Sequence, residues 1–134
     1  MSGITYDYME DYIRSLIPEE NNKFKELEDF ARDNKVPIAQ KETAKFLEFI
    51  VSMKKPLKIL ELGTAIGYSA ILMYEASGNK ASITTVERDE NMIKYARENF
   101  KKYNLEDRIE IIQGDCLDVL ENLQGKYDLI FMDA

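Results

Sequence analysis

The chain of 134 residues contains no histidine, no tryptophan and a single cysteine, Cys116. Without histidine it cannot form a Ser-His-Asp triad, a Cys-His nucleophile pair or a His-ligated zinc site. One cysteine cannot form a disulfide within the chain, which is typical of a reducing compartment. Long apolar runs are also absent. The longest uncharged stretch, Leu62 to Tyr74, has 13 residues and two glycines, so we expect no membrane-spanning segment.

An excess of positive charge is missing as well. Lys and Arg total 18 against 25 Asp and Glu, a formal net charge of −7. Nucleic-acid binding usually relies on a basic face, so this balance lowers the expectation of an RNA or DNA partner. The acidic N-terminus lacks the basic and apolar regions of a signal peptide. We therefore expect a cytoplasmic protein without a membrane partner.

The periodicity of apolar residues changes near residue 56. Before it, three helical patterns are expected, and their apolar stripes are interpreted as core: Ile13, Leu16 and Ile17; Phe24, Leu27 and Ala31; Phe46, Leu47, Ile50 and Val51. After it, strands at 57–62, 81–87, 108–112 and 127–132 alternate with helices at 66–75, 91–103 and 116–123. This alternation predicts an α/β fold with a mostly parallel sheet. We divide the chain into a helical segment, 1–55, and an α/β half-domain, 56–134.

The fourth predicted strand stands directly at the chain end, with only Asp133 and Ala134 after it. An apolar strand with nothing beside it leaves an open sheet edge, which proteins normally avoid. We therefore expect that the sequence is the N-terminal portion of a larger α/β domain.

The most informative motif is Glu61-Leu62-Gly63-Thr64-Ala65-Ile66-Gly67-Tyr68-Ser69, at the turn from the first strand to its helix. Ligands of doubly wound sheets bind beyond the carboxyl ends of the strands. Gly63 would allow a tight turn beside a ligand, and Gly67 would let the helix approach the sheet. Ser69 and the free amides of the helix N-terminus could hold a ligand carboxylate.

Acidic residues follow the other three strands. Glu87 ends the second strand, at a place where a carboxylate can accept hydrogen bonds from both ribose hydroxyls. Asp115 follows the third strand and Asp133 the fourth. The dinucleotide fingerprint needs a glycine where Ala65 stands, and no P-loop ending occurs. A nucleoside with a carboxylate and no phosphate fits better, as in S-adenosylmethionine (SAM).

The motif at 61–69, Glu87, Gly114-Asp115-Cys116 and Phe131-Met132-Asp133-Ala134 together resemble class I SAM-dependent methyltransferases. More narrowly, they are similar to the cation-dependent O-methyltransferase family, which includes catechol, caffeoyl-CoA and bacterial tRNA 5-hydroxyuridine enzymes. The segment from Val36 to Gln40 shares this resemblance. It implies a Rossmann-like sheet of order 3-2-1-4, truncated after the fourth strand, with N-terminal helices, and a homodimer.

The resemblance also implies roles for individual residues. The methionine part of SAM would lie against Glu61, Gly63, Thr64, Tyr68 and Ser69, with the backbone of Ile38 and Ala39 closing over it. Glu87 would bind the ribose, and Asp115 and Cys116 would border the adenine. Asp133 would contact the cofactor, act in catalysis and be the first ligand of Mg²⁺. The acceptor would be a small hydroxylated aromatic molecule or 5-hydroxyuridine in tRNA.

Two alternatives remain open at this stage. The family's other metal ligands and last strands lie after the fourth strand, so the chain could instead be a non-catalytic, SAM-binding or self-associating fragment. A nicotinamide-dependent oxidoreductase is a further alternative, which Ala65 disfavours.

Overall fold

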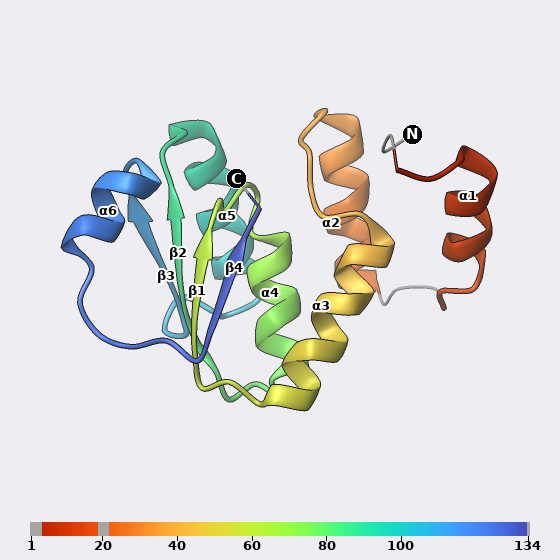
Figure 1. The fold of residues 1–134 in the computed structure, drawn as a ribbon. Helices are drawn as coiled ribbons and strands as arrows, with labels where there is room; N and C mark the ends of the chain where they lie inside the picture. Colours follow the sequence, from red (N-terminus) through yellow and green to blue (C-terminus); the bar gives the residue numbers. More distant parts are fainter. Residues whose placement is uncertain (1–3, 19–21, 134) are drawn as a thin grey trace.

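The computed structural model describes residues 4–18 and 22–133, and Ala134 of the last motif lies outside them. The described residues form six helices and four strands (Figure 1). The helices are α1 (Asp7–Ser15), α2 (Asn22–Asp33), α3 (Lys41–Lys54), α4 (Tyr68–Ala76), α5 (Glu90–Lys102) and α6 (Cys116–Asn122). The strands are β1 (Lys58–Leu62), β2 (Ser82–Glu87), β3 (Ile109–Gln113) and β4 (Leu129–Met132).

All four strands are parallel and lie in the order β3-β2-β1-β4, which confirms the predicted α/β fold and strand order. β1 pairs with β2 on one side and with β4 on the other, so the strand order changes direction at β1, which is the switch point of the sheet. A crevice opens at such a switch point, beyond the carboxyl ends of the strands. The order of the strands therefore places the predicted acidic residues around one crevice.

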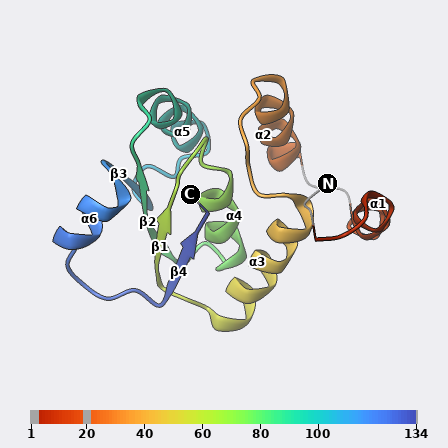
Figure 2. The same cartoon turned by 45° about the horizontal axis from the view of Figure 1, so that its top comes forward.

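The two faces of the sheet are covered unequally. Helices α2 to α5 lie on one face, and α6 lies on the other (Figure 2). The larger core cluster joins Ile59 and Ile83 of the sheet to Leu47 of α3 and Ile71 of α4. The smaller cluster under α6 is built on Leu60, Leu62 and Val86. Residues of both predicted segments, 1–55 and 56–134, therefore share one core.

The predicted core stripes of the first and third helices are partly wrong. Ile13 and Leu16 of α1 are exposed, and so is Phe46 of α3. Leu47 and Val51 of the predicted α3 stripe are buried as expected, together with Ala44, because that face meets α4. The stripe on α2 is buried as expected. None of the described helices has the length and apolar character needed to cross a bilayer.

The observed boundaries agree with the predicted ones to within about two residues. β4 begins at Leu129, two residues later than expected, and Asp128 just before it is bonded to the start of β1. Its carboxylate accepts hydrogen bonds from the backbone N–H groups of Leu57 and Lys58, at 2.9 and 3.0 Å. These bonds hold the pKa of Asp128 below its usual value. They also anchor the start of β4 against the start of β1.

Candidate functional site

A cleft of about 620 Å³ opens at the carboxyl ends of the strands. Backbone hydrogen bonds continue the sheet for one further residue at this edge: Gly63 N–H to Val86 O, Gly114 N–H to Glu87 O, and Asp133 N–H to Leu62 O. The loops after all four strands therefore start at one level. The cleft is lined by Val36, Pro37, Gly63, Ala65, Val86, Glu87, Arg88, Asp89, Met92, Gly114, Asp115, Cys116, Leu117 and Asp133.

The loop between β1 and α4 is turned by three residues with positive φ: Gly63 at 101°, Ala65 at 47° and Gly67 at 91°. Ala65 is the unusual one, because a side chain in the left-handed region is strained. At Gly67, an added Cβ would lie 2.6 Å from a ring carbon of Phe100. The close approach that the structure shows at Gly67 is therefore to Phe100 of α5.

Glu87 is fixed at the end of β2 by three backbone amides. Its Oε1 accepts from Ala65 N–H at 3.0 Å, and its Oε2 accepts from Arg88 and Asp89 N–H at 3.1 and 3.0 Å. A carboxylate has about four acceptor positions, so capacity remains for a ligand. The carboxylate is thus oriented before any ligand arrives, and it ties the β1–α4 loop to the β2–α5 loop.

The far wall of the cleft follows β3. Asp115 caps α6 by accepting a hydrogen bond from Leu117 N–H at 2.9 Å, and its other oxygen lies 3.8 Å from a guanidinium nitrogen of Arg88. Burial, with the charges of Asp115 and Glu87, raises the pKa of the Cys116 thiol. A protonated thiol is a weak nucleophile, so Cys116 contributes shape rather than reactivity. Asp133 is exposed at the end of β4.

Beneath the cleft, three buried side chains are linked by hydrogen bonds. Thr85 Oγ1 donates to Glu61 Oε1 at 2.7 Å, and Thr64 Oγ1 lies 2.6 Å from Thr85 Oγ1. Glu61 Oε2 is buried with no hydrogen-bond partner in the described part of the chain. Burial, with smaller contributions from the Asp133 and Glu87 charges, raises the pKa of Glu61 to about 8, although the Thr85 bond opposes this.

The structure gathers Gly63, Glu87, Asp115, Cys116 and Asp133 around the cleft. The other predicted site residues lie outside its lining: Ile38, Ala39, Glu61, Thr64, Tyr68 and Ser69. The ring of Tyr68 is buried edge-on to Phe24, and its hydroxyl lies 3.4 Å from Glu28 Oε1. Ser69 is half-buried in the first turn of α4, and Ile38 packs against the larger core.

Several lining residues were not identified from the sequence. The segment from Val36 to Gln40 does reach the cleft, but through Val36 and Pro37 and not through Ile38 and Ala39, which were assigned to the cofactor. Asp89 was not singled out either, although an Asp before a helical run is a typical N-cap. It accepts hydrogen bonds from Asn91 and Met92 N–H at 2.8 and 3.1 Å.

A magnesium ion is not supported by the side chains present. Among residues 4–18 and 22–133, no group of three His, Cys, Asp or Glu side chains could hold a metal ion. Mg²⁺ prefers six oxygen ligands in octahedral geometry, and Asp133 supplies one carboxylate. The described residues therefore do not fit a Mg²⁺ site by themselves.

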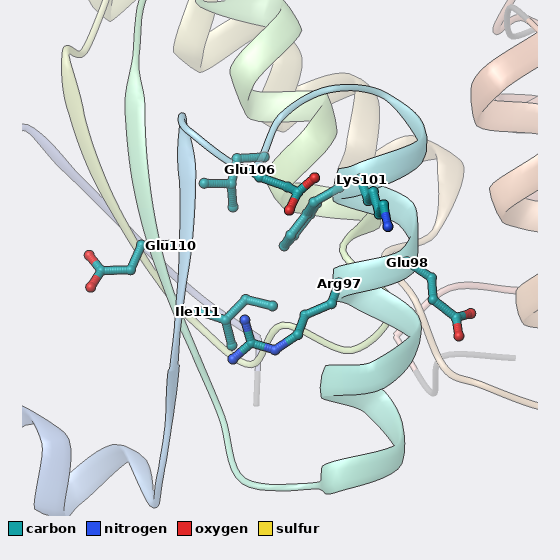
Figure 3. A pocket seen from close by; sticks show the side chains of 8 residues that line it. Arg97, Glu98, Lys101, Glu106, Glu110 and Ile111 are labelled. Atoms are coloured by element: carbon teal, nitrogen blue, oxygen red, sulfur yellow. The ribbon is translucent and has the colours of Figure 1, made fainter.

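A second cavity, of about 420 Å³, lies between α5 and β3. Figure 3 shows Arg97 extending toward Ile111, whereas Glu98 and Glu110 point away from the cavity. Phe100 and Ile109 form its buried floor. This cavity lies beside the edge strand, away from the loops at the strand ends, and it contains none of the predicted site residues.

Comparisons with known proteins agree with this arrangement. An O-methyltransferase from Aspergillus hancockii is 41% identical over 81 residues, which are 60% of this chain and 32% of that protein. The catechol O-methyltransferase of Mycobacterium tuberculosis is 32% identical over 94 residues, which are 69% of this chain and 43% of that protein. The chain therefore spans less than half the length of these two relatives.

The structure is also similar to solved structures. A Podospora anserina methyltransferase crystallised with bound S-adenosylhomocysteine (SAH) superposes with a TM-score of 0.87 at 32% identity. The match covers 96% of this chain and 56% of that one. The sequence model of the O-methyltransferase family matches residues 15–134 of this chain. The chain belongs to the O-methyltransferase family.

Proposed function

We propose that this chain binds SAM in the cleft and is the cofactor-binding portion of an enzyme that methylates a hydroxyl group. The observation that carries the proposal is the Glu87 carboxylate, held by three amides at the end of β2. Its remaining acceptor positions suit the two ribose hydroxyls. Asp115 and Met92 would then border the adenine, and Gly63 and Asp133 would lie toward the methionine end.

The charge of the cleft favours SAM over a dinucleotide. Four carboxylates line it, those of Glu87, Asp89, Asp115 and Asp133, and Arg88 is the one cation among the described lining residues. SAM carries a sulfonium and an ammonium group against one carboxylate, whereas a dinucleotide carries an anionic pyrophosphate. Like charges in a partly enclosed site repel. The nicotinamide alternative is therefore disfavoured on electrostatic grounds as well as by Ala65.

Bound SAM would supply an electrophilic methyl group on a cationic sulfur. The residues of this chain would orient it: Glu87 fixes the nucleoside, and the acidic lining balances the positive charge. Correct positioning of two reactants accounts for a large part of a methyl-transfer rate. We propose Asp133 as the carboxylate nearest the acceptor, because it ends the strand beside β1 and is exposed.

The finer predictions drawn from the family resemblance remain proposals. A cation-dependent reaction would need metal ligands in addition to Asp133. A small hydroxylated aromatic acceptor fits the net charge of −7 better than tRNA does, since tRNA binding benefits from a basic surface. A homodimer is also proposed.

A second function has one observation in its favour. Ile130 and Met132 of β4 are exposed on the sheet face that carries α6. If this chain acts without a covering segment, binding of SAM without methyl transfer, or self-association through β4, is the function we would expect.

The test is isothermal titration calorimetry of the chain with SAM, SAH and NADH. We expect saturable binding of SAM and SAH, weakened by added salt for the cationic SAM in particular, and no binding of NADH. Added Mg²⁺ should leave the affinity unchanged. Glu87→Ala should weaken binding by about 1–3 kcal/mol, because it removes hydrogen bonds to a charged acceptor.

Glu90→Ala is the matched control, since Glu90 is an exposed glutamate three residues away and does not line the cleft. Equal affinity of the Glu87→Ala variant and the original chain would overturn the ribose assignment. Saturable NADH binding would overturn the choice of SAM.

A further inference from the structure

The cavity between α5 and β3 lies where the sheet ends. Helix α5 buries Ile93, Ala96 and Phe100, and it contacts β2 and β3. β3 is the outermost strand on this side of the sheet that the described residues form. Arg97 and Lys101 each follow a buried residue of α5 by one position, so they extend over the open edge of β3. The cavity of about 420 Å³ is the space that they border.

The floor of the cavity is apolar. Phe100 and Ile109 are 2% and 3% exposed, and Ile111 is half-buried. All three belong to the larger core cluster or pack against it, so the core of the protein holds the floor in place. Hydrocarbon placed on such a surface is stabilised by about 25 cal/mol for each Å² removed from water. The volume lies within the range of roughly 300–1,000 Å³ that is usual for small-molecule sites.

Two cations stand at the mouth of the cavity. Arg97 and Lys101 are four residues apart on α5, so their side chains lie on the same face of the helix. Lys102, the next residue, pairs with Glu26 at 2.9 Å. In contrast, no carboxylate in residues 4–18 and 22–133 lies within ion-pair distance of Arg97 or Lys101. Their charges are therefore available to a ligand.

The acidic residues of the lining compensate only part of this charge. Figure 3 shows the carboxylates of Glu98 and Glu110 pointing away from the cavity. Glu106 is the third acid of the lining. Two cations against this one carboxylate leave a net charge of +1 at the mouth. A ligand with a single negative charge matches this balance, and electrostatic attraction in a partly enclosed site favours it over a neutral one.

The backbone of β3 supplies a further donor at the same place. Ile83 N–H donates to Arg108 O and Gly114 N–H donates to Glu87 O, both at 2.9 Å, at the two ends of the β2–β3 ladder. Alternate residues of a strand bond to the same parallel neighbour, and those between them turn their backbone groups the other way. This register turns the N–H of Ile111, a lining residue, toward the open edge.

The edge of β3 is less suited to a peptide than to a small ligand. Glu110 is an exposed charge within the strand, and charged side chains on edge strands discourage pairing with another chain. The first N–H of the strand is also occupied, because Ile109 N–H donates to Leu105 O at 2.9 Å. An added strand would therefore find few backbone partners here.

We propose that this cavity is a second binding site, whose ligand is a small monocarboxylate with an apolar body. The hydrocarbon would cover Phe100, Ile109 and Ile111, and the carboxylate would bind Arg97 and Lys101. Inorganic phosphate and nucleotides do not fit, because they carry more negative charge and little or no hydrocarbon for the floor. The cavity shares no lining residue with the cleft, so the proposal is independent of SAM binding.

The test is a titration of the ¹⁵N-labelled chain with octanoate, followed by two-dimensional NMR. We expect saturable shifts of the amide signals of Lys101 and Ile111, without matching shifts at Gly63 and Asp133 of the cleft. Octanamide, the neutral analogue, should bind at least about tenfold more weakly, since it lacks the charge that the mouth attracts. Added salt should weaken the binding of octanoate and leave that of octanamide nearly unchanged.

Arg97→Gln tests the role of the mouth. It removes a charge at an exposed position and should raise the Kd for octanoate about tenfold. Lys94→Gln is the matched control, because Lys94 is an exposed cation of the same helix that lies outside the lining. Arg88→Gln removes the cation of the cleft and should leave octanoate binding unchanged. Circular dichroism shows whether each variant is folded.

Octanoate binding that Arg97→Gln weakens and Lys94→Gln leaves intact would support the site. Absence of saturable binding would overturn it. So would equal affinity for octanamide, shifts confined to the cleft, or a folded Arg97→Gln variant with unchanged affinity. Failure of SAH binding would concern the proposed function alone, since it leaves the octanoate shifts at Lys101 and Ile111 as they are.

Discussion

Replacement of Glu61 by glutamine tests the electrostatics of the buried chain beneath the cleft. Burial raises the pKa of this carboxyl from 4.5 to about 8. Between these two pH values the folded protein holds a proton on Glu61 that the unfolded chain releases. The folded state therefore binds more protons, and its stability falls as the pH rises from about 4.5 to about 8. Above pH 8 both states are ionised, and the loss from this group is complete.

The magnitude follows from the two pKa values. At about 1.4 kcal/mol for each pH unit between them, ionisation of Glu61 removes up to about 5 kcal/mol from the free energy of unfolding. Glutamine cannot ionise, so Glu61→Gln abolishes this slope. Its amide nitrogen would replace the unpartnered Oε2 without gaining an acceptor among the described residues. That buried donor costs about 1–3 kcal/mol at every pH.

The two stability curves should therefore cross. The variant is expected to be less stable than the original chain near pH 4.5 and more stable, by about 2 kcal/mol or more, near pH 8. Urea unfolding followed by circular dichroism at several pH values measures this, since the chain has no tryptophan for fluorescence. Glu110→Gln, at an exposed position on β3, is the control. Its curve of unfolding free energy against pH should run parallel to that of the original chain. Parallel curves for Glu61→Gln would refute the reasoning.

Three further substitutions test the loops around the cleft, each by urea unfolding. Ala65→Gly should stabilise the protein by up to about 1 kcal/mol, because it relieves the left-handed backbone at φ 47°; a loss of stability would contradict the strain. Gly67→Ala should destabilise it by about 1–3 kcal/mol through the contact with Phe100, and the double variant with Phe100→Leu should recover part of that loss. Asp89→Ala removes two hydrogen bonds at the start of α5 and should cost about 1 kcal/mol; an unchanged midpoint would show that the cap contributes nothing.

The sheet was predictable because its signals are local. Each strand is a short apolar run followed by a glycine or an acid, and parallel strands place those residues at one edge. Glu87, Asp115 and Asp133 could therefore be assigned to the cleft before their surroundings were known. The periodicity of α2 likewise sufficed to identify its buried face.

Features that depend on packing between elements could not be predicted. Thr85 looks like any β-branched strand residue, and only the register of β1 and β2 brings its hydroxyl to Glu61. Tyr68 belongs to the loop motif, but its ring is buried in the core, where it packs edge-on against Phe24 of α2. The orientation of α1 is set by Arg14 and Glu42, which lie 28 residues apart. Helical periodicity reveals a stripe but not which side of it faces the protein.

The attachment of Glu87 to three amides has a consequence for how this protein can vary. The β1–α4 loop and the β2–α5 loop both donate to the Glu87 carboxylate, although Ala65 and Glu87 are 22 residues apart in sequence. A change in the length or path of either one displaces the carboxylate and, through it, the other. The two loops therefore behave as one mechanical unit, and insertions are better tolerated elsewhere, for example in the connection from α6 to β4. The rigidity of the end of the cleft that we propose for the nucleoside then leaves variation to the opposite end, where Asp133 lies.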